Sequence, residues 1–200
     1  MSIFAKAWQL LRLHLQLLLA LNLAFFGLVA ITGAIGNPEF AAWFGSRMQE
    51  SAQLGIAQWA HAWWGKNFLA TFPAIAAINF FVGSVFYLTL PSLVIPGAAL
   101  PLVLFRAFVW GVISSEWAMR GDYGGLLLII LEGEAYVLAT TAAILHVRAW
   151  LLPKRVGASN HRDGYRVGLR QNLLLQTLVA TELVIAALYE TALLMTVGRS

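Results

Sequence analysis

Long runs of apolar residues dominate the chain, and short polar segments separate them. A helix of about 20 residues, at 1.5 Å per residue, matches a hydrocarbon core about 30 Å thick. The runs are too continuous for the strands of a membrane barrel, and an open sheet could not satisfy its backbone in lipid. The pattern predicts an all-α membrane protein with five transmembrane helices, in a single polytopic membrane domain over residues 1–200. The spans are expected at about residues 17–36, 68–90, 92–115, 124–147 and 172–197.

The segment between the first two spans has a different pattern, with aromatic and aliphatic residues at roughly helical spacing and polar residues between them. Such a pattern is typical of an amphipathic helix in the membrane interface. We expect this outer helix at about residues 39–65. Because tryptophan prefers the headgroup zone, an anchoring aromatic belt is favoured over a docking surface for a partner. The expected interface anchors are Trp43, Trp59, Trp63 and Trp64.

Composition supports a membrane protein, because 60% of the residues are hydrophobic and only 11% are charged, against roughly 25% charged residues in soluble chains. The chain has no cysteine, which excludes disulfides, thiolate metal sites and cysteine nucleophiles. A net charge of +4 does not indicate nucleic-acid binding here, since the basic residues lie in the tails and loops of a membrane protein.

Lysine and arginine are distributed unevenly between the two ends of the expected spans. Eight precede the first span or join the fourth to the fifth, and four lie on the opposite side. The positive-inside rule then predicts a bacterial inner-membrane protein with a cytoplasmic N-terminus and an external C-terminus. The basic loop either meets anionic lipid, at about 1 kcal/mol per basic residue, or binds a partner. Its residues are Arg148, Lys154, Arg155, Arg162, Arg166 and Arg170.

Five ionisable residues fall inside the expected spans, where each isolated charge costs about 3 kcal/mol. They are Arg106, Glu132, Glu134, Glu182 and Glu190. Counted from the outer ends of their spans, all but Glu182 lie at a similar depth of roughly 10–15 Å. We therefore expect a buried ionic cluster of Arg106 with Glu190 and one glutamate of the fourth span. Glu132 and Glu134 project about 200° apart on a helix, so only one of them can face a given partner.

One arginine cannot neutralise four glutamates, so the others must be protonated, hydrated or paired with another subunit. Two interpretations follow. The cluster locks the helical bundle, or it forms a polar site for the movement of an ion, a proton or a substrate.

Signatures of enzymatic chemistry are absent, including the His-Glu-x-x-His metal motif, the phosphate-binding loop and the Gly-x-Ser-x-Gly elbow. His14 and His146 are expected at the same ends of their spans. Two histidines at one depth are a haem ligand pair in principle, but hydrogen bonding at the interface is the favoured interpretation. We expect neither a cofactor nor a metal.

The second half of the chain carries short motifs: Gly83-Ser84 in the second span, Glu134-Ala-Tyr-Val-Leu-Ala in the fourth, and Ala187-Leu-Tyr-Glu190-Thr-Ala in the fifth. With Gly164-Tyr-Arg-Val-Gly-Leu-Arg before the last span, they resemble the stage II sporulation protein M family over about residues 67–197. The chain has Leu131-Glu132-Gly133 where that family usually has Pro-His-Gly. The resemblance implies a non-enzymatic membrane anchor that localises partner proteins, and it singles out Glu134 and Glu190.

We therefore expect a non-enzymatic scaffold or assembly subunit of a larger membrane complex, with membrane lipid and other membrane subunits as partners and no nucleic acid. The main alternative is a transporter or channel component that uses the intramembrane glutamates. A further alternative is an accessory subunit of a respiratory or photosynthetic complex.

Overall fold

The structure is a computed structural model that describes residues 2–36, 39–40, 43, 46–47, 67–119, 121 and 123–197. Within these residues all regular elements are helical. The elements are α1 (Ile3–Leu13), α2 (Leu15–Ile35), α5 (Phe68–Ala77), η1 (Ile78–Thr89), α6 (Leu90–Val94), α7 (Ala99–Met119), α8 (Tyr123–Leu151), η2 (Pro153–Val156) and α9 (His161–Val197).

Four stretches of the described chain are long and apolar enough to cross a membrane, which indicates a multi-pass membrane protein. They are Leu15–Ile35, Phe68–Val94, Tyr123–Leu151 and His161–Thr196. A shorter apolar helix, Ala99–Ser115, belongs to α7, which runs beside α2. The all-helical architecture is as expected, and the status of α7 as a fifth span stays a prediction.

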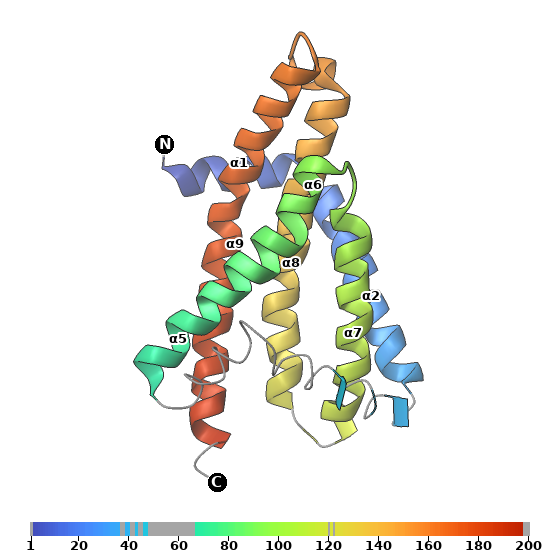
Figure 1. The fold of residues 1–200 in the computed structure, drawn as a ribbon, viewed down its shortest axis with the longest axis vertical. Helices are drawn as coiled ribbons and strands as arrows, with labels where there is room; N and C mark the ends of the chain where they lie inside the picture. Colours follow the sequence, from blue (N-terminus) through green and yellow to red (C-terminus); the bar gives the residue numbers. More distant parts are fainter. Residues whose placement is uncertain are drawn as a thin grey trace.

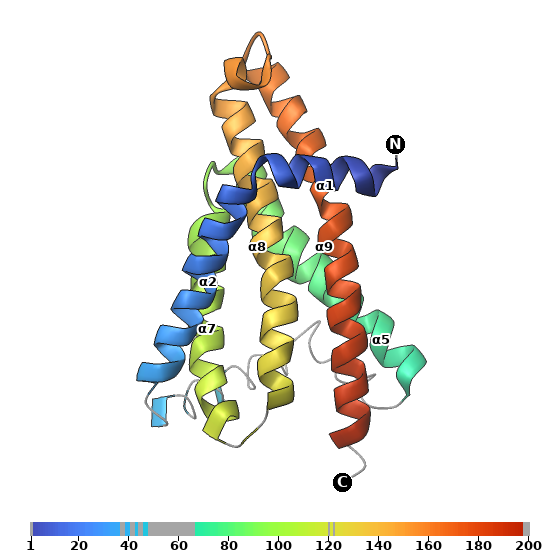
Figure 2. The ribbon, with the colours of Figure 1, turned by 180° about the vertical axis from the view of Figure 1, so that it is seen from behind.

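The long helices form a bundle around α8. Figures 1 and 2 show α2, α7, α8 and α9 running along the long axis, while the continuous helix of α5, η1 and α6 crosses them diagonally. Most of α8 between Ala135 and Ala143 is fully buried. Its small residues let α9 pack closely against it, through side chains such as Val179 and Leu183 that are 0% exposed.

Helix α1 lies across the bundle instead of along it (Figures 1 and 2). The Ser2 hydroxyl caps its start by accepting a hydrogen bond from the Ala5 N–H at 3.2 Å. The chain turns at His14, whose backbone φ of −121° interrupts the helix before α2. Ile3, Phe4 and Trp8 are about half exposed, at 53%, 49% and 51%. An apolar helix face that lies across the spans is typical of a helix in the plane of the membrane interface.

The boundary expected at Pro91 was wrong. The second apolar helix continues through Pro91 to Val94, and the turn comes at residues 95–98, where Gly97 has a φ of +88°. Residues 92–94 therefore belong to this helix, and α7 begins at Ala99. Pro91 lies inside this continuous helix, just after the junction of η1 and α6, where its missing N–H removes one backbone hydrogen bond from the helix. The sequence also carried no signal for the 12-residue π-helix η1.

The basic segment is not a loop, contrary to expectation. Helix α8 extends to Leu151 and α9 already begins at His161, so only a short 3₁₀ turn and a few residues connect them. The expected outer helix at residues 39–65 lies largely outside the described residues, as do Trp59, Trp63 and Trp64. Trp43 is described; its side chain is 55% exposed and its ring stacks on Phe40 at 5.8 Å.

Helices α2 and α7 pack through small residues, and this contact generates a prediction. A Cβ added at Gly111 would meet the carbonyl oxygen of Val29 at 2.6 Å and the hydroxyl of Thr32. Backbone cannot yield as a flexible side chain does, so we expect Gly111→Ala to lower the free energy of unfolding by about 1–3 kcal/mol. The measurement is unfolding of the purified chain in mixed micelles by titration with denaturing detergent.

Gly27→Ala is the matched control in the neighbouring helix, because a Cβ added there meets nothing within 4 Å. It should leave stability unchanged or raise it by up to about 1 kcal/mol, since alanine favours a helix over glycine. Equal effects of the two substitutions would contradict the close packing of α2 on α7.

Candidate functional site

A first cavity, of about 230 Å³, lies among α5, η1, α7, α8 and α9. We call it the Arg106 cavity. Its polar wall combines one cation, an amide and two carboxyl groups from four different elements. They are Arg106, Asn79, Glu132 and Glu190, with Trp110 and aliphatic side chains completing the lining. The sequence-predicted Arg106, Glu132 and Glu190 thus share one cavity.

Aromatic rings hold the guanidinium of Arg106. Its Cζ lies 3.8 Å from the ring centre of Tyr136, 4.9 Å from that of Trp110 and 6.0 Å from that of Tyr87. Such contacts stabilise a cation by up to about 2 kcal/mol where water is excluded. The Nε atom of Arg106 is buried and has no hydrogen-bond partner. The faces of the Tyr136 and Trp110 rings therefore contribute to stabilising the positive charge.

The direct ion pairs expected for Arg106 are not made. None of the four intramembrane glutamates lies within 4.0 Å of a guanidinium nitrogen of Arg106; an ion pair of that length is formed elsewhere, on the surface, by Arg166 and Asp163 at 3.8 Å. Glu132 is only 7% exposed and accepts a hydrogen bond from the Asn79 side-chain amide at 2.7 Å. The acids and the arginine therefore share the cavity without closing on one another.

A second cavity, of about 300 Å³, lies on another face of α8. We call it the Arg12 cavity, and its polar residues are Arg12, Glu134 and Glu182. Glu134 accepts a hydrogen bond from the Asn22 side-chain amide at 3.2 Å. The guanidinium of Arg12 lies 5.4 Å from the ring centre of Trp8. Glu132 and Glu134 thus face different cavities, in keeping with their opposite directions on a helix.

The remaining sequence-predicted site is the basic segment, which forms a helical hairpin of residues 148–170. We call it the basic arm. Figures 1 and 2 show it extending beyond α1, at the end of the bundle away from the C-terminus. All six of its cations are exposed to solvent. They are Arg148, Lys154, Arg155, Arg162, Arg166 and Arg170.

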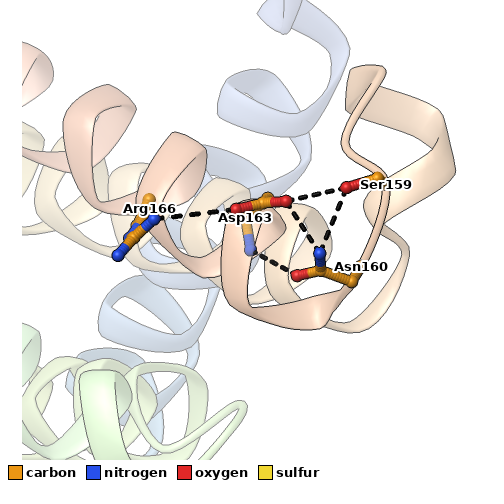
Figure 3. A network of polar contacts seen from close by, with 4 residues as sticks. All are labelled: Ser159, Asn160, Asp163 and Arg166. Carbon is orange, nitrogen blue, oxygen red and sulfur yellow. Dashed lines mark hydrogen bonds and ion pairs between the residues drawn. The ribbon is translucent and has the colours of Figure 1, made fainter.

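A network of polar contacts organises the tip of the basic arm (Figure 3). Asn160 caps α9, because its Oδ1 accepts from the Asp163 N–H at 2.9 Å. The Asp163 carboxylate in turn accepts from the Ser159 hydroxyl at 2.7 Å and the Asn160 amide at 2.8 Å. This acid in the first turn also complements the helix dipole. The tip is therefore a turn held by side-chain hydrogen bonds, and these bonds fix the residue at which α9 begins.

The two helices of the arm approach each other through glycines. A Cβ added at Gly164 would meet the Ala149 carbonyl carbon at 3.2 Å, and one at Gly168 would lie 2.7 Å from the His146 carbonyl oxygen. Beside this contact the ring of Tyr165 meets those of His146 and Trp150 edge-on, at 4.5 Å and 5.2 Å. Close backbone packing and interlocked rings make the base of the arm stiff.

His14 and His146 do not share a cofactor pocket among the cavities described above. The ring of His146 is fully buried against α9, whereas His14 lies at the break between α1 and α2. Burial lowers the pKa of His14 below its usual value, and the positive charge of Arg148 lowers it further. The arrangement suits an uncharged histidine at the junction of α1 and α2, close enough to Arg148 to sense its charge.

Three features of these sites were not predicted, and the sequence carried a signal only for the first. The two asparagines, Asn22 and Asn79, are polar residues in apolar runs and could have been flagged as carboxyl partners on that ground. The approach of Arg12 to Glu134 and Glu182 depends on α1 turning across the bundle. The aromatic surroundings of Arg106 depend on how three elements pack together.

Comparison with known proteins adds no relative: no family model, no curated protein and no solved structure matches the chain. The resemblance to the stage II sporulation protein M family therefore stays an expectation from its short motifs.

The geometry of Arg106 generates a prediction about its stabilising partner. A double-mutant cycle of Arg106→Met with Tyr136→Leu should give a coupling energy of about 1–2 kcal/mol, because the guanidinium carbon lies 3.8 Å from the centre of this ring. The corresponding cycle with Glu190→Gln should give a smaller coupling. Unfolding in mixed micelles measures both. A larger coupling to Glu190 would show that a direct ion pair holds the arginine.

Proposed function

We propose that this chain is a non-enzymatic integral membrane scaffold, or assembly subunit, of a larger membrane complex, and that the basic arm is its partner surface. The observation that carries the proposal is the construction of the arm. A segment that only retained its side of the protein in the cytoplasm would need charges and nothing more. This segment is a capped, glycine-packed helical hairpin that presents six exposed cations.

The length of the arm helices supports this role. Helix α9 has 37 residues and α8 has 29, which correspond to about 55 Å and about 43 Å of helix. Both exceed a hydrocarbon core of about 30 Å. The excess lies at the end of the bundle beyond α1 (Figure 1). The arm is therefore placed to reach a partner beyond the headgroup zone.

For orientation, we propose a bacterial inner-membrane protein with five spans, in which α7 is the third. The eight cations Lys6, Arg12, Arg148, Lys154, Arg155, Arg162, Arg166 and Arg170 belong to α1 and the arm, at one end of the bundle. The positive-inside rule then places this end in the cytoplasm. The C-terminus, at the other end of the bundle in Figure 1, lies outside.

The partner class that best fits the arm is an acidic protein surface. Its cations project from a stiff support, and such a pattern favours a defined docking geometry over diffuse attraction to lipid. The resemblance to the stage II sporulation protein M family points in the same direction, because it implies an anchor for other proteins.

Site-specific photo-crosslinking in native membranes tests this proposal. A photoreactive residue in place of Arg155 or Arg162 should give a discrete protein adduct, because these exposed positions lie on the arm. Reversing two neighbouring charges, Lys154→Glu with Arg155→Glu, should reduce the Arg162 adduct by about tenfold, if the pair contributes about 1.4 kcal/mol to docking.

The matched control is the photoreactive residue at Leu23, which is 78% exposed on the apolar surface of α2. It should give lipid adducts and no protein adduct that responds to the arm charges. Lipid adducts alone at Arg155 and Arg162 would reject the scaffold in favour of a lipid-binding arm.

A further inference from the structure

The Arg106 cavity combines a polar wall with an apolar one. Its charged and amide side chains are those of Arg106, Asn79, Glu132 and Glu190, and the rest of the lining is Trp110 with four isoleucines and one leucine. Small-molecule sites in proteins have this composition, a mostly apolar surface with a few convergent polar groups. The cavity therefore has the composition of a ligand site.

The polar wall of the cavity runs from a partly exposed rim to a buried carboxyl group. Arg106, Asn79 and Glu190 are only partly buried, whereas Glu132 is 7% exposed. A carboxylate at such a buried position is costly unless a positive charge and hydrogen-bond donors offset it. Glu132 therefore marks the part of the cavity where a cation is stabilised most.

The charges in the cavity do not balance when both carboxyl groups are ionised, because one guanidinium faces two carboxylates. Glu132 and Glu190 are close enough to repel each other. The guanidinium of Arg106 lies 3.8 Å from the ring centre of Tyr136 and is not bonded to either acid. Asn79 contributes one neutral hydrogen bond to Glu132, at 2.7 Å. The cavity therefore lacks one positive charge between the two glutamates.

An ammonium group supplies this charge together with three hydrogen-bond donors. A carboxylate accepts at about four sites, and Asn79 uses one of those on Glu132, so both glutamates have acceptors to offer. An anion would add to the negative charge of the cavity, and a zwitterion would leave it unchanged. The charge therefore favours a ligand with a single positive charge.

The size and the apolar wall of the cavity favour an organic ion over a bare metal ion. A cavity of about 150 Å³ accommodates a benzene-sized molecule. The Arg106 cavity, at about 230 Å³, accommodates a ligand of roughly six to ten non-hydrogen atoms on the same scale. Its isoleucine side chains offer contacts to a hydrocarbon group and no ligand to a metal.

We propose that the Arg106 cavity binds a small organic ammonium ion, whose charged group lies between Glu132 and Glu190 and whose hydrocarbon part contacts the isoleucines. Arg106 cancels one of the two carboxylate charges, so a monocation makes the occupied cavity neutral. This inference does not depend on the scaffold role, because the residues that line the cavity lie outside the basic arm.

Equilibrium binding of radiolabelled cyclohexylammonium to the full chain in lipid nanodiscs tests the proposal, with binding to empty nanodiscs subtracted. Binding should saturate at one probe per chain. Unlabelled cyclohexylammonium should displace the probe. Cyclohexanol has the same ring without the charge, and cyclohexanecarboxylate has the opposite charge, so neither should displace it at the same concentration.

Two glutamates of α9 provide a matched pair of variants. Glu190→Gln keeps the shape of the side chain and removes its charge from the cavity, so the affinity for cyclohexylammonium should fall by about tenfold or more. Glu182→Gln makes the same change in the Arg12 cavity and should leave the affinity unchanged. Ile113→Phe takes up space in the Arg106 cavity without changing its charge, and it should also weaken binding by about tenfold or more.

The absence of saturable binding to the wild type would show that a proton or water balances the carboxyl groups, and it overturns the proposal. Equal displacement by cyclohexanol overturns it as well, because the site would then recognise the ring and not the charge. So do equal losses of affinity in Glu190→Gln and Glu182→Gln. If Glu190→Gln fails to fold, Ile113→Phe remains decisive, and an unchanged affinity in that variant overturns the proposal.

Discussion

A formal charge inside a bilayer has to be offset close to where it lies, and the arrangement around α8 follows from this requirement. Two glutamates flank Gly133 and leave the helix on opposite sides. Each is met by an asparagine from a different neighbour, Asn22 of α2 or Asn79 of η1. The polar contacts thus tie α8 to two elements that otherwise touch it through apolar side chains. These two contacts add polar links to the apolar packing of α8 in the bundle.

The arginines are stabilised in a way that leaves the acids free for other contacts. Arg106 lies against the faces of Tyr136 and Trp110, so its charge is lowered in energy without a bonded carboxylate. The ring contacts leave the Glu132 carboxyl group to accept its hydrogen bond from Asn79.

Most of the fold could be predicted from the lengths of the apolar runs, because a helix in lipid must satisfy its own backbone hydrogen bonds over the full hydrocarbon thickness. The expected first span at residues 17–36 is α2, Leu15–Ile35. Helix ends were less predictable where a polar segment continued a helix. The α8–α9 hairpin continues both spans in a polar sequence, held by contacts such as those of Gly168 with His146 that no local pattern reveals. Counting residues from the span ends predicted that Arg106 and Glu190 lie at the same depth. Which α8 glutamate joins them, Glu132 or Glu134, depends on the rotation of α8 about its own axis, and the sequence does not reveal this rotation.

Helix α9 is one unbroken element from His161 to Val197. It therefore carries the tip of the arm, Glu182 and Glu190 on a single rod. From Asp163 to Glu190 the rod is about 40 Å long. If such a helix tilts as a rigid rod, a swing of about 5° displaces its far end by about 3.5 Å. A load applied to the arm outside the lipid is thus mechanically linked to the carboxyl groups of both cavities.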